Sequence, residues 1–479
     1  MPKPLSSFHF YIALFSSLLT LGLLATCGGG SGSSVGVVPS TTASVTTTIS
    51  DQPSCLIPNG NFQNVWVTIT RVRANTSSAA GPNDSGWVDL VNLQNNPTQI
   101  DLLSLPSPTC LLTQLGAASG IPTGQYQQIR LHLLSNTPGP GEAFPQSNNC
   151  NGNGFNCVIT AGGAIQTILI SSEAQTGIQI PAGEIARGSF TVAVGQTTNL
   201  NIDFDACSSV IQQANGQFLL KPVLHAGVIP LNNNFISGTV INSVTKGGIP
   251  KAIVFFEQAD PSNPSIDRII AQTTTGPVGD FIICPLPSGS YDVVVAAKDS
   301  LKNIIYNATV TLQVPLGTAM GQIPLIQPTG QTGTESGTIS GQVTTANPVG
   351  LPTSANLSLS ALQQSGSLLV TIPPLPGLPS STPNLPSENG TASYTLVLPP
   401  SNPSVGTFSA SPPTFYSPPT PAPGIYFVNA QAFVPMSFSS NPGSPDCNPS
   451  SLPVSFNTGQ LVVGPGGTVT QNFNFTGCQ

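Results

Sequence analysis

The sequence predicts an all-β protein built from tandem antiparallel β-sandwich domains of the Ig-like or prealbumin-like type. Short segments in which apolar and polar residues alternate recur along the chain and are rich in β-branched residues. Gly and Pro, at 48 residues each, separate these segments as turn formers. Beyond the first 26 residues, no long run combines helical spacing with strong helix formers. These features favour sheets that are apolar toward a partner sheet and polar on the other face.

The first group of alternating segments follows a spacer. Val35–Ser50 is rich in Ser, Thr and Val, and we expect it to remain a spacer or to become an edge strand. In Asn64–Arg73, aliphatic residues alternate with Trp66 and two threonines, which predicts a half-buried strand. Ser189–Val194 and Thr198–Ala206 are expected to form a hairpin. Further strands are expected at Trp87–Val91, Ile100–Leu105, Tyr126–Leu134 and Gln217–Leu224.

Six blocks in this region carry a resemblance to a known family. The blocks are Ser50–Pro53, Val65–Ile69, Ile100–Leu103, Gly124–Leu131, Asn201–Asp205 and Leu219–Val223. In this order they resemble the bacterial lipoprotein family called domain of unknown function 4382, which has no established activity. The resemblance implies a lipoprotein, with carbohydrate or surface-polymer binding as an expectation. The chain departs from the family by an Asn-rich insertion bounded by cysteines around Asn148–Cys157.

A second group of segments resembles a different sandwich. The blocks are Ser237–Val240, Ile249–Ala252, Gly279–Phe281 and Pro287–Tyr291. Together they resemble the carboxypeptidase-regulatory-like, transthyretin-like domain, which implies a spacer or adhesion unit without chemistry of its own. We expect Gly289 to form the tight turn into a strand and Tyr291 to fill the space between the sheets. The strands are expected at Ile236–Val240, Ala252–Phe256, Ile269–Thr273, Asp280–Ile283, Tyr291–Ala297 and Ala308–Val314.

The C-terminal part of the chain is predicted to repeat the second sandwich. Ile339–Val343 echoes the first strand of that sandwich, and Pro423–Val428 echoes Ser288–Val293. A recurrence at domain length indicates duplicated sandwiches and not a short-period solenoid. Two Pro-rich inserts, at residues 373–386 and 412–423, are expected to form extended surface loops because Pro cannot enter a central strand.

The N-terminus resembles a bacterial lipoprotein signal. Lys3 precedes an apolar run over Phe10–Leu24, and Cys27 follows it, ahead of the Gly/Ser-rich spacer Gly28–Ser34. In lipoproteins this cysteine becomes the first residue of the mature protein and is acylated, so the resemblance assigns a palmitate-type lipid to Cys27. A plain signal peptide cut nearby, with Cys27 free or disulfide-bonded, is the alternative.

These features divide the chain and place it in the cell. The expected segments are a signal peptide at 1–26, a lipidated cysteine with a linker at 27–43, and sandwich domains at 44–230, 235–328 and 336–479. The lipid would hold the protein at the cell membrane or outer membrane, facing the periplasm or the extracellular space. Because Gly28, and not Asp, follows the anchor cysteine, outer-membrane sorting is favoured.

The composition restricts the partners. Charged residues make up 6% of the chain, the net charge is −7 and the pI is about 4.7. This balance argues against nucleic acid and against polybasic lipid binding. The expected partners are therefore a membrane, through the lipid on Cys27, and a surface glycan or protein. No cofactor is expected, and no Cys-x-x-Cys pair indicates a metal.

The cysteines indicate disulfides. Without Cys27 the chain keeps eight, and an even number in an exported protein is typical of a disulfide-bonded one. Cys150 and Cys157 flank a short Asn/Gly loop and are expected to pair, as are Cys447 and Cys478. Among the remaining four, Cys284 lies in a different predicted domain from the others, so one of them bridges domains or stays reduced. The remaining four are Cys55, Cys110, Cys207 and Cys284.

Asp203 and Asp205 are the main carboxylate candidates, because both point outward from one strand face. We favour an ion pair with Arg130 or Lys221 on a neighbouring strand, which would also hold the register. Calcium binding and glycoside hydrolysis by the paired carboxylates are the alternatives, in that order. His132 lies beside Arg130, and we expect it to be solvated or hydrogen-bonded across the strands, because no nucleophile motif accompanies it.

Trp66 and Trp87 are the only tryptophans of the chain. Exposed aromatic rings stack against sugars, so each is a candidate platform, whereas burial in the sandwich is the favoured alternative. The sequence thus predicts a non-catalytic, lipid-anchored surface protein that binds a carbohydrate or a partner protein through its first domain, with the others as spacers. A structural or assembly role through sheet edges is the alternative, and a glycoside hydrolase is the least favoured.

Lipid attachment is tested by metabolic labelling. A palmitate analogue should label the wild-type protein and not Cys27→Ala, which should leave the membrane fraction because it lacks the acyl chains. An unlabelled wild type that fractionates in the same way as Cys27→Ala would contradict the lipoprotein assignment.

Overall fold

The computed structural model describes residues 42–476, apart from internal segments. Those segments are 52–61, 106–111, 171–175, 213–215, 221, 231, 233, 262, 300–303, 328–334, 348, 354, 376–383, 388, 412, 420–422 and 434–453. The predicted signal peptide and the predicted pair Cys447–Cys478 therefore lie outside the described residues, together with Cys27, Cys55 and Cys110. The side chain of Cys207 is likewise not described.

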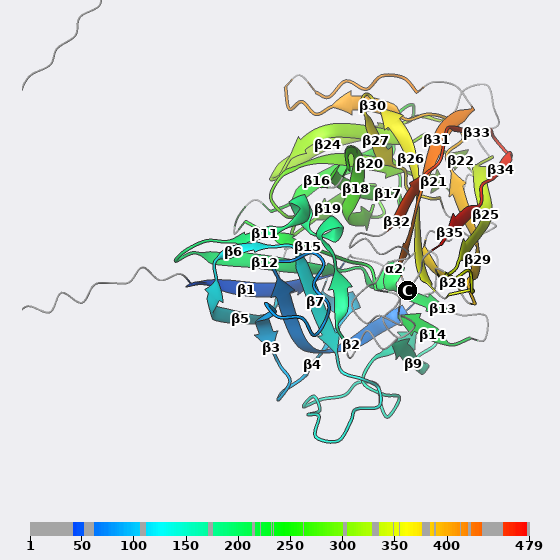
Figure 1. Cartoon of the computed structure of the whole chain (residues 1–479). Helices are drawn as coiled ribbons and strands as arrows, with labels where there is room; N and C mark the ends of the chain where they lie inside the picture. Colours follow the sequence, from blue (N-terminus) through cyan, green and yellow to red (C-terminus); the bar gives the residue numbers. More distant parts are fainter. Residues whose placement is uncertain are drawn as a thin grey trace, which may run out of the picture. The chain divides into compact units, whose positions relative to one another are not determined.

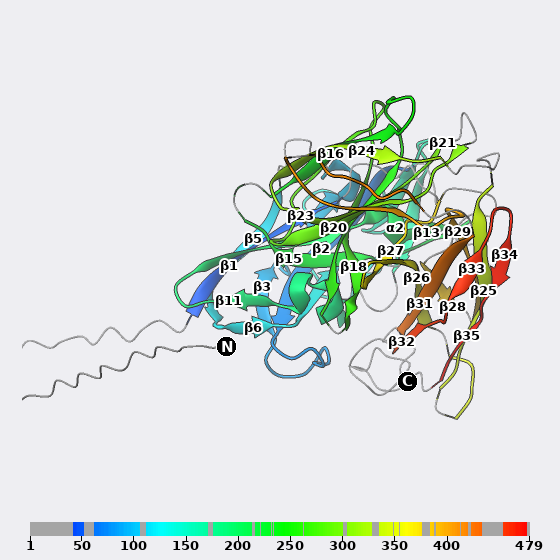
Figure 2. The same ribbon diagram turned by 90° about the horizontal axis from the view of Figure 1, so that it is seen from above.

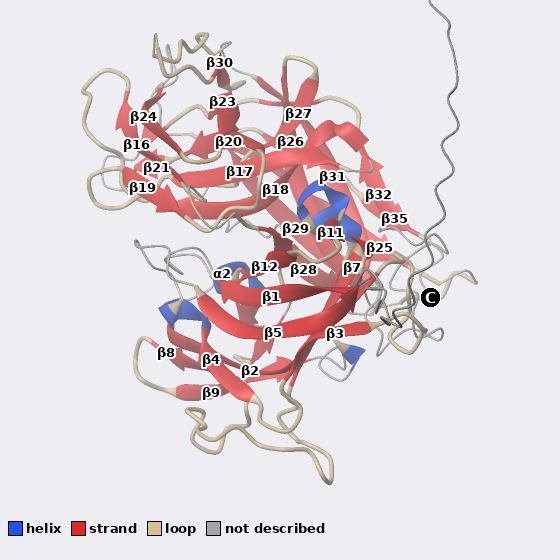
Figure 3. Cartoon of the chain, turned by 90° about the vertical axis from the view of Figure 1, so that its left-hand side faces the viewer, coloured by secondary structure: helices blue, strands red, loops and turns tan. Residues whose placement is uncertain are grey.

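The described chain is all-β, as predicted (Figure 1, Figure 3). The helical elements with described bounds are one α-helical turn, α2 (Ala206–Ser209), and three 3-10 turns. Most strand pairs are antiparallel, but parallel pairs also occur in every part of the fold, so the sheets are mixed. The 3-10 turns are η1 (Leu102–Ser104), η2 (Ala182–Glu184) and η3 (Ala186–Gly188).

Two large sheets form the N-terminal part of the structure. Their strand orders are β15-β12-β1-β5 and β10-β7-β2-β8-β9-β14-β13, and β3 and β4 also pair with β2. The strands are β1 (Thr42–Ser50), β2 (Phe62–Asn75), β3 (Val88–Asn92), β4 (Thr98–Asp101), β5 (Thr113–Pro122), β6 (Gly124–Tyr126), β7 (Gln128–Leu133), β8 (Cys157–Thr160), β9 (Ile165–Ile170), β10 (Ile178–Ile180), β11 (Phe190–Val192), β12 (Thr197–Phe204), β13 (Val210–Gln212), β14 (Phe218–Leu220) and β15 (Leu224–Val228).

The core between these sheets follows the predicted alternation. Val65, Val67 and Ile69 of β2 are fully buried in it. A register shift between Ile69 and Arg71 then changes the phase of the strand, so that Val72 and Ala74 continue the core face. The bulge also turns Arg71 and Arg73 to the outer face of the sheet.

Two predictions about this part are wrong. β1 is not an edge strand: it lies between β12, with which it is parallel, and β5, with which it is antiparallel. The predicted hairpin does not form, because β11 pairs with β6 while β12 pairs with β1 and β15. Both errors concern partners that are distant in sequence, for which a local pattern contains no signal.

The strands of the remaining chain form two related groups. The first group is β16 (Ile236–Asn242), β17 (Ile253–Asp260), β18 (Asn263–Thr274), β19 (Asp280–Ile283), β20 (Ser290–Ala296), β21 (Lys298–Asp299), β22 (Ile304–Ile305), β23 (Thr309–Pro315) and β24 (Thr318–Leu325). The second group is β25 (Gly337–Thr345), β26 (Ala355–Ser365), β27 (Leu368–Thr371), β28 (Asn384–Ser387), β29 (Thr391–Leu398), β30 (Ser404–Thr407), β31 (Gly424–Phe433), β32 (Val454–Asn457), β33 (Leu461–Val463), β34 (Thr468–Thr470) and β35 (Phe473–Phe475).

The second group repeats the pairing of the first. β16 is antiparallel to β19 and parallel to β24. In the same way, β25 is antiparallel to β29 and parallel to β34 and β35, an arrangement that Figure 2 shows. The sequence echo between residues 236–240 and 339–343 thus corresponds to one strand position in both groups.

The two groups share one sheet, with the order β30-β23-β20-β17-β18-β27-β26-β31-β32. Its centre is buried on both faces: Val254 and Phe256 of β17 enter one core, whereas Ile253 and Phe255 enter the other. This two-sided burial explains why the sequence of β17 begins with a continuous apolar run instead of an alternation. The second core also contains residues of the C-terminal strands, so the groups are not independent sandwiches.

A buried tyrosine fixes a turn in each part of the fold. The hydroxyl groups of Tyr126, Tyr291 and Tyr426 donate hydrogen bonds to the backbone carbonyls of Pro122, Pro287 and Pro399. Tyr291 is fully buried and fills the space between the sheets, as expected. Burial raises the pKa of the Tyr291 phenol, so the group remains a protonated donor.

Removing one hydroxyl group should test this role. Tyr291→Phe leaves the buried carbonyl of Pro287 without its donor, so the free energy of unfolding should fall by about 1–3 kcal/mol. Tyr416→Phe is the control. The Tyr416 hydroxyl forms a hydrogen bond with the Thr311 hydroxyl, but Tyr416 itself is half-exposed, so its removal should lower the free energy of unfolding by less. Urea unfolding of both variants measures the difference, and equal losses would contradict a special role for the buried tyrosine.

Candidate functional site

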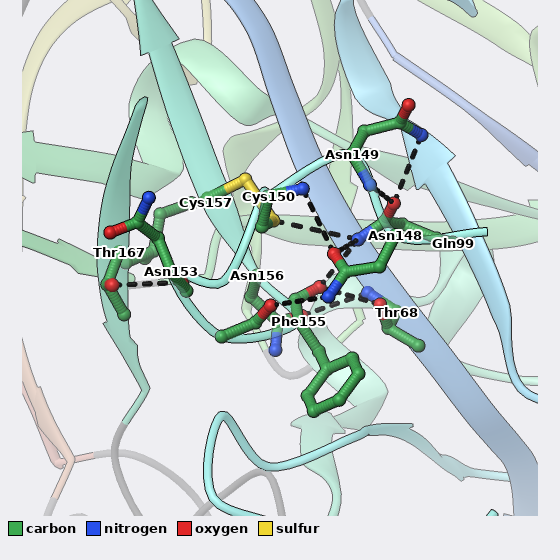
Figure 4. The surroundings of a disulfide bond; sticks show 12 residues. Thr68, Gln99, Asn148, Asn149, Cys150, Asn153, Phe155, Asn156, Cys157 and Thr167 are labelled. Carbon is green, nitrogen blue, oxygen red and sulfur yellow. Dashed lines mark hydrogen bonds between the residues drawn. A yellow bond between two sulfur atoms is a disulfide. The ribbon is translucent and has the colours of Figure 1, made fainter. Parts of the chain in front are cut away.

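The candidate site is the insertion between β7 and β8, residues 135–157, which we call the Asn loop. Cys150 and Cys157, the pair indicated by the sequence, form a disulfide that closes its C-terminal end (Figure 4). Both cysteines are fully buried, so the bridge fastens the loop to the sheet at the start of β8. Cys284 is also disulfide-bonded, so it is not the cysteine that stays reduced.

Two asparagines hold the base of the Asn loop. The Oδ1 atom of Asn136 accepts hydrogen bonds from the backbone N–H groups of Phe155 and Asn156, both at 2.8 Å. Asn156 is fully buried; its Oδ1 accepts from the N–H of Thr68 at 2.9 Å, and its Nδ2 donates to the carbonyl of Leu134 at 2.7 Å. The loop is therefore bonded directly to β2 and to the end of β7.

Gln99 of β4 fixes the outer turn of the loop (Figure 4). Its Oε1 accepts from the backbone N–H of Asn149 at 2.7 Å, and its Nε2 donates to Oδ1 of Asn148 and to the carbonyl of Phe155, both at 3.1 Å. Asn151 and Gly152 then adopt positive φ angles of 46° and 84°, which Asn and Gly tolerate better than other residues. The side-chain amides thus determine one conformation for a loop without regular structure.

The Asn loop presents one exposed aromatic ring. Phe144 is 60% exposed and stacks on Phe155, with ring centroids 5.4 Å apart and an interplanar angle of 20°. Exposed amides of Gln146, Asn149 and Asn151 lie in the same loop. The one ionisable residue of the loop is Glu142, whose Oε2 accepts from the N–H of Gly139 at 2.7 Å.

Sequence reasoning missed Phe144, although it singled out the insertion. The available signal was one aromatic residue placed among Pro, Gly and Ser/Asn/Gln residues, where no apolar alternation requires a core side chain. What the sequence could not show was that the ring of Phe155 stacks against the ring of Phe144.

The two tryptophans are half-buried. The indole N–H of Trp87 donates to the carbonyl of Gly81 at 2.7 Å. The guanidinium carbons of Arg73 and Arg130 lie 5.2 and 5.4 Å from the Trp87 ring centroid, in the range of cation–π contacts. Trp66 lies in β2 opposite Cys157.

Arg130 and His132 do not face solvent freely. Arg130 is only 1% exposed, and its Nη1 donates to the carbonyls of Thr176 and Gly177 at 3.3 and 3.2 Å. His132 is half-buried opposite Arg71, on the same strand face. The segment 76–86 covers this face; its carbonyls at Ser78 and Pro82 accept hydrogen bonds from neighbouring side chains.

Asp203 lies on β12 of the other sheet and Asp205 directly follows that strand; their side chains are 8% and 3% exposed. Asp203 accepts a hydrogen bond from Ser50 Oγ at 2.8 Å, and Asp205 accepts one from Gln272 of β18. The strand face does point away from the core, as predicted, but residues of the following part of the chain cover it.

Near this pair, His225 lies opposite Asp203 in the β12–β15 register. Its Nδ1 is 2.8 Å from Oε2 of Glu184. Burial disfavours the charged imidazolium, but the hydrogen bond to Glu184 and the surrounding carboxylates outweigh this and raise the pKa of His225. The cluster thus combines a partly exposed His–Glu ion pair with two carboxylates that are almost fully buried.

The described residues contain no group of three His, Cys, Asp or Glu side chains placed to hold a metal ion. They also contain no helix with the length and apolarity needed to cross a bilayer.

Residues 42–222 match the family model DUF4382, a domain of unknown function. The match confirms the resemblance stated for the first predicted domain and covers less than half of the chain. No curated protein sequence matches the chain.

Several solved surface proteins are similar at a low level. The TIE protein of Bacillus anthracis is 9% identical, with 91% of this chain and 50% of that chain covered and a TM-score of 0.14. The chain thus spans half the length of that protein. A streptococcal ancillary pilin is 9% identical over 90% of this chain and 99% of its own, with a TM-score of 0.16. The shaft pilin of Lactobacillus rhamnosus GG is 10% identical over 61% and 98%, also with 0.16. Similarity at this level supports no argument about function.

The hydrogen bonds at the base of the Asn loop give a testable prediction. Asn156→Ala leaves two buried backbone groups, at Thr68 and Leu134, without partners, so the free energy of unfolding should fall by about 2–5 kcal/mol. Gln146→Ala, at an exposed position of the same loop with an ordinary backbone φ angle, is the matched control. Thermal or urea unfolding compares the two, and an Asn156→Ala variant as stable as the control would show that the network does not hold the loop.

Proposed function

We propose that the protein is a non-catalytic, lipid-anchored surface protein that binds a neutral carbohydrate through the Asn loop. The observation that carries the proposal is the exposed ring of Phe144, supported by Phe155 on a disulfide-closed loop of amide side chains. The lipid anchor and the surface location rest on the sequence around Cys27.

The chemistry of the Asn loop suits a sugar. The face of a pyranose ring is an apolar C–H surface that packs on an aromatic ring, and Phe144 offers such a ring to solvent. Sugar hydroxyls both donate and accept hydrogen bonds, as do the amides of Gln146, Asn149 and Asn151. A loop already held in one conformation loses little entropy on binding.

The charge of the Asn loop suits a neutral sugar in particular. The loop contains no Lys, Arg or His, and its single carboxylate is bonded within the loop. Uronic or sulfated polymers would find no cation there and would approach a chain whose net charge is −7. We therefore assign neutral hexose polymers as the ligand class.

The other candidate groups support a binding role and not a catalytic one. Asp203 and Asp205 are nearly inaccessible, so a substrate glycosidic bond could not lie between them. Trp87 is already engaged by two guanidinium groups. The sheets that follow the first predicted domain share strands and a core, which suits a rigid support for the Asn loop.

Affinity electrophoresis of the full chain in gels containing a neutral glucan, mannan or galactan tests the proposal. Phe144→Ala should weaken retardation about tenfold or more, because stacking on an aromatic ring contributes about 1.4 kcal/mol or more. Phe415→Ala is the matched control, because Phe415 is 82% exposed and lies outside the Asn loop. The assignment would be contradicted if Phe144→Ala were retarded as strongly as the wild type, or if Phe415→Ala lowered retardation by the same amount as Phe144→Ala.

A further inference from the structure

Three carboxylic acids from neighbouring strands meet in the shared sheet. Glu257 of β17 lies directly opposite Asp292 of β20 in the antiparallel register. Asp267 of β18 forms a side-chain hydrogen bond with Asp292. Glu257 is fully buried and Asp267 is 2% exposed, whereas Asp292 is half-buried, so two of the three carboxyl groups are removed from water. We call Glu257, Asp267 and Asp292 the carboxyl cluster.

The carboxyl cluster lies where the two strand groups join. Strand β27 attaches to β18 in parallel, with Ile266 beside Leu369. At the end of β27, the N–H of Thr371 donates to Oε2 of Glu257 at 2.9 Å, and its hydroxyl donates to the carbonyl of Asp267 at 3.2 Å. The joint between the groups therefore depends on hydrogen bonds to residues of the cluster.

No basic side chain balances the carboxyl cluster in the described part of the chain. Arg268 follows Asp267 but points to the opposite face of the strand, where it pairs with Asp260. The strands that pack nearby, β23, β26 and β27, contain no ionisable residue, and the other titratable group of β20, Tyr291, lies in the core. Moreover, Glu257 Oε1 and Asp267 Oδ2 are buried without a hydrogen-bond partner among the described atoms.

Buried carboxyl groups without a counter-ion are stable only in their protonated, uncharged form. Burial, followed by the hydrogen bond and the charge of Asp292, raises the pKa of Asp267 to about 8. Burial, followed by the charge of Asp267, raises the pKa of Glu257 well above its usual range. Glu257 and Asp267 are therefore largely protonated, and uncharged, at acidic and neutral pH.

We propose that the carboxyl cluster is a pH-operated joint. It keeps β27 attached to β18 while Glu257 and Asp267 are protonated, and it releases β27 when these two acids ionise. Ionisation places like charges side by side in a site without a counter-ion, and outward movement of β27 is the route by which water reaches them.

The direction of the pH effect follows from proton linkage. Asp267 has an ordinary pKa of 3.8 and a raised one in the folded state. The closed joint therefore binds more protons than the open one between these values, so its stability is full below about pH 4 and falls as the pH rises toward about 8. Above the folded-state pKa the loss is complete and the profile becomes flat.

Limited trypsin digestion of the full chain measures the opening. The bond after Arg268 lies in β18 at the joint, whereas Lys246 is exposed in a turn and reports the activity of the protease at each pH. The ratio of cleavage after Arg268 to cleavage after Lys246 should rise with pH, by up to tenfold per pH unit for each proton released, and level off above about pH 8.

Asp267→Asn removes one of the two acids whose folded-state pKa is raised, so its cleavage ratio should rise less steeply with pH than that of the wild type. Asp280→Asn, which replaces an exposed carboxylate on β19, should keep the wild-type profile. If Asp267→Asn does not fold, Asp292→Asn provides a second test: loss of its charge lowers the folded-state pKa of Asp267, so the rise should end at a lower pH and reach a smaller final ratio. A wild-type ratio independent of pH, or an Asp267→Asn or Asp292→Asn variant that follows the wild-type curve, would overturn the proposal.

Discussion

Buried polar groups in this chain have few charged partners available, because only 6% of its residues are charged. An unsatisfied polar group in the interior is costly, so neutral donors and acceptors must do the pairing. Asn156 bonds two backbone groups of neighbouring strands, and buried tyrosines bond proline carbonyls at the turns. The conformation of the turns and of the Asn loop depends on these amide and hydroxyl bonds.

This constraint separates two kinds of site. The Asn loop is rigid and exposed, its one ionisable residue is Glu142, and the aromatic ring of Phe144 projects from it. The buried acids behave in the opposite way: Asp203 and Asp205, like Glu257, lie at junctions between parts of the chain. Acidic side chains thus lie where strands from distant segments meet, whereas the proposed binding surface has Glu142 as its single ionisable residue.

Much of the fold followed from the sequence. The alternation around Val65 and Val67 predicted a core strand correctly, and the strands from Ile236 to Val314 were placed within a few residues. The short spacing of Cys150 and Cys157 predicted their disulfide. These features are local, so the sequence pattern determines them.

What the sequence could not show depends on distant contacts. β1 became a central strand because it pairs with β12, about 150 residues further on. The burial of Arg130 depends on a segment that folds over it. The continuous apolar run at Ile253–Phe256 is explained only by the second core, which buries the other face of the strand. Phe144 could not be chosen from the insertion because its support, Phe155, is set by the fold of the loop.

The most direct test of the account is hydrogen–deuterium exchange of the full chain, with and without a neutral oligosaccharide, at about 50 mM and about 500 mM salt. The account predicts protection confined to peptides that cover residues 142–155, equal at both salt concentrations because no ion pair contributes. Protection at Trp66 or Trp87 instead, or binding that salt abolishes, would contradict it.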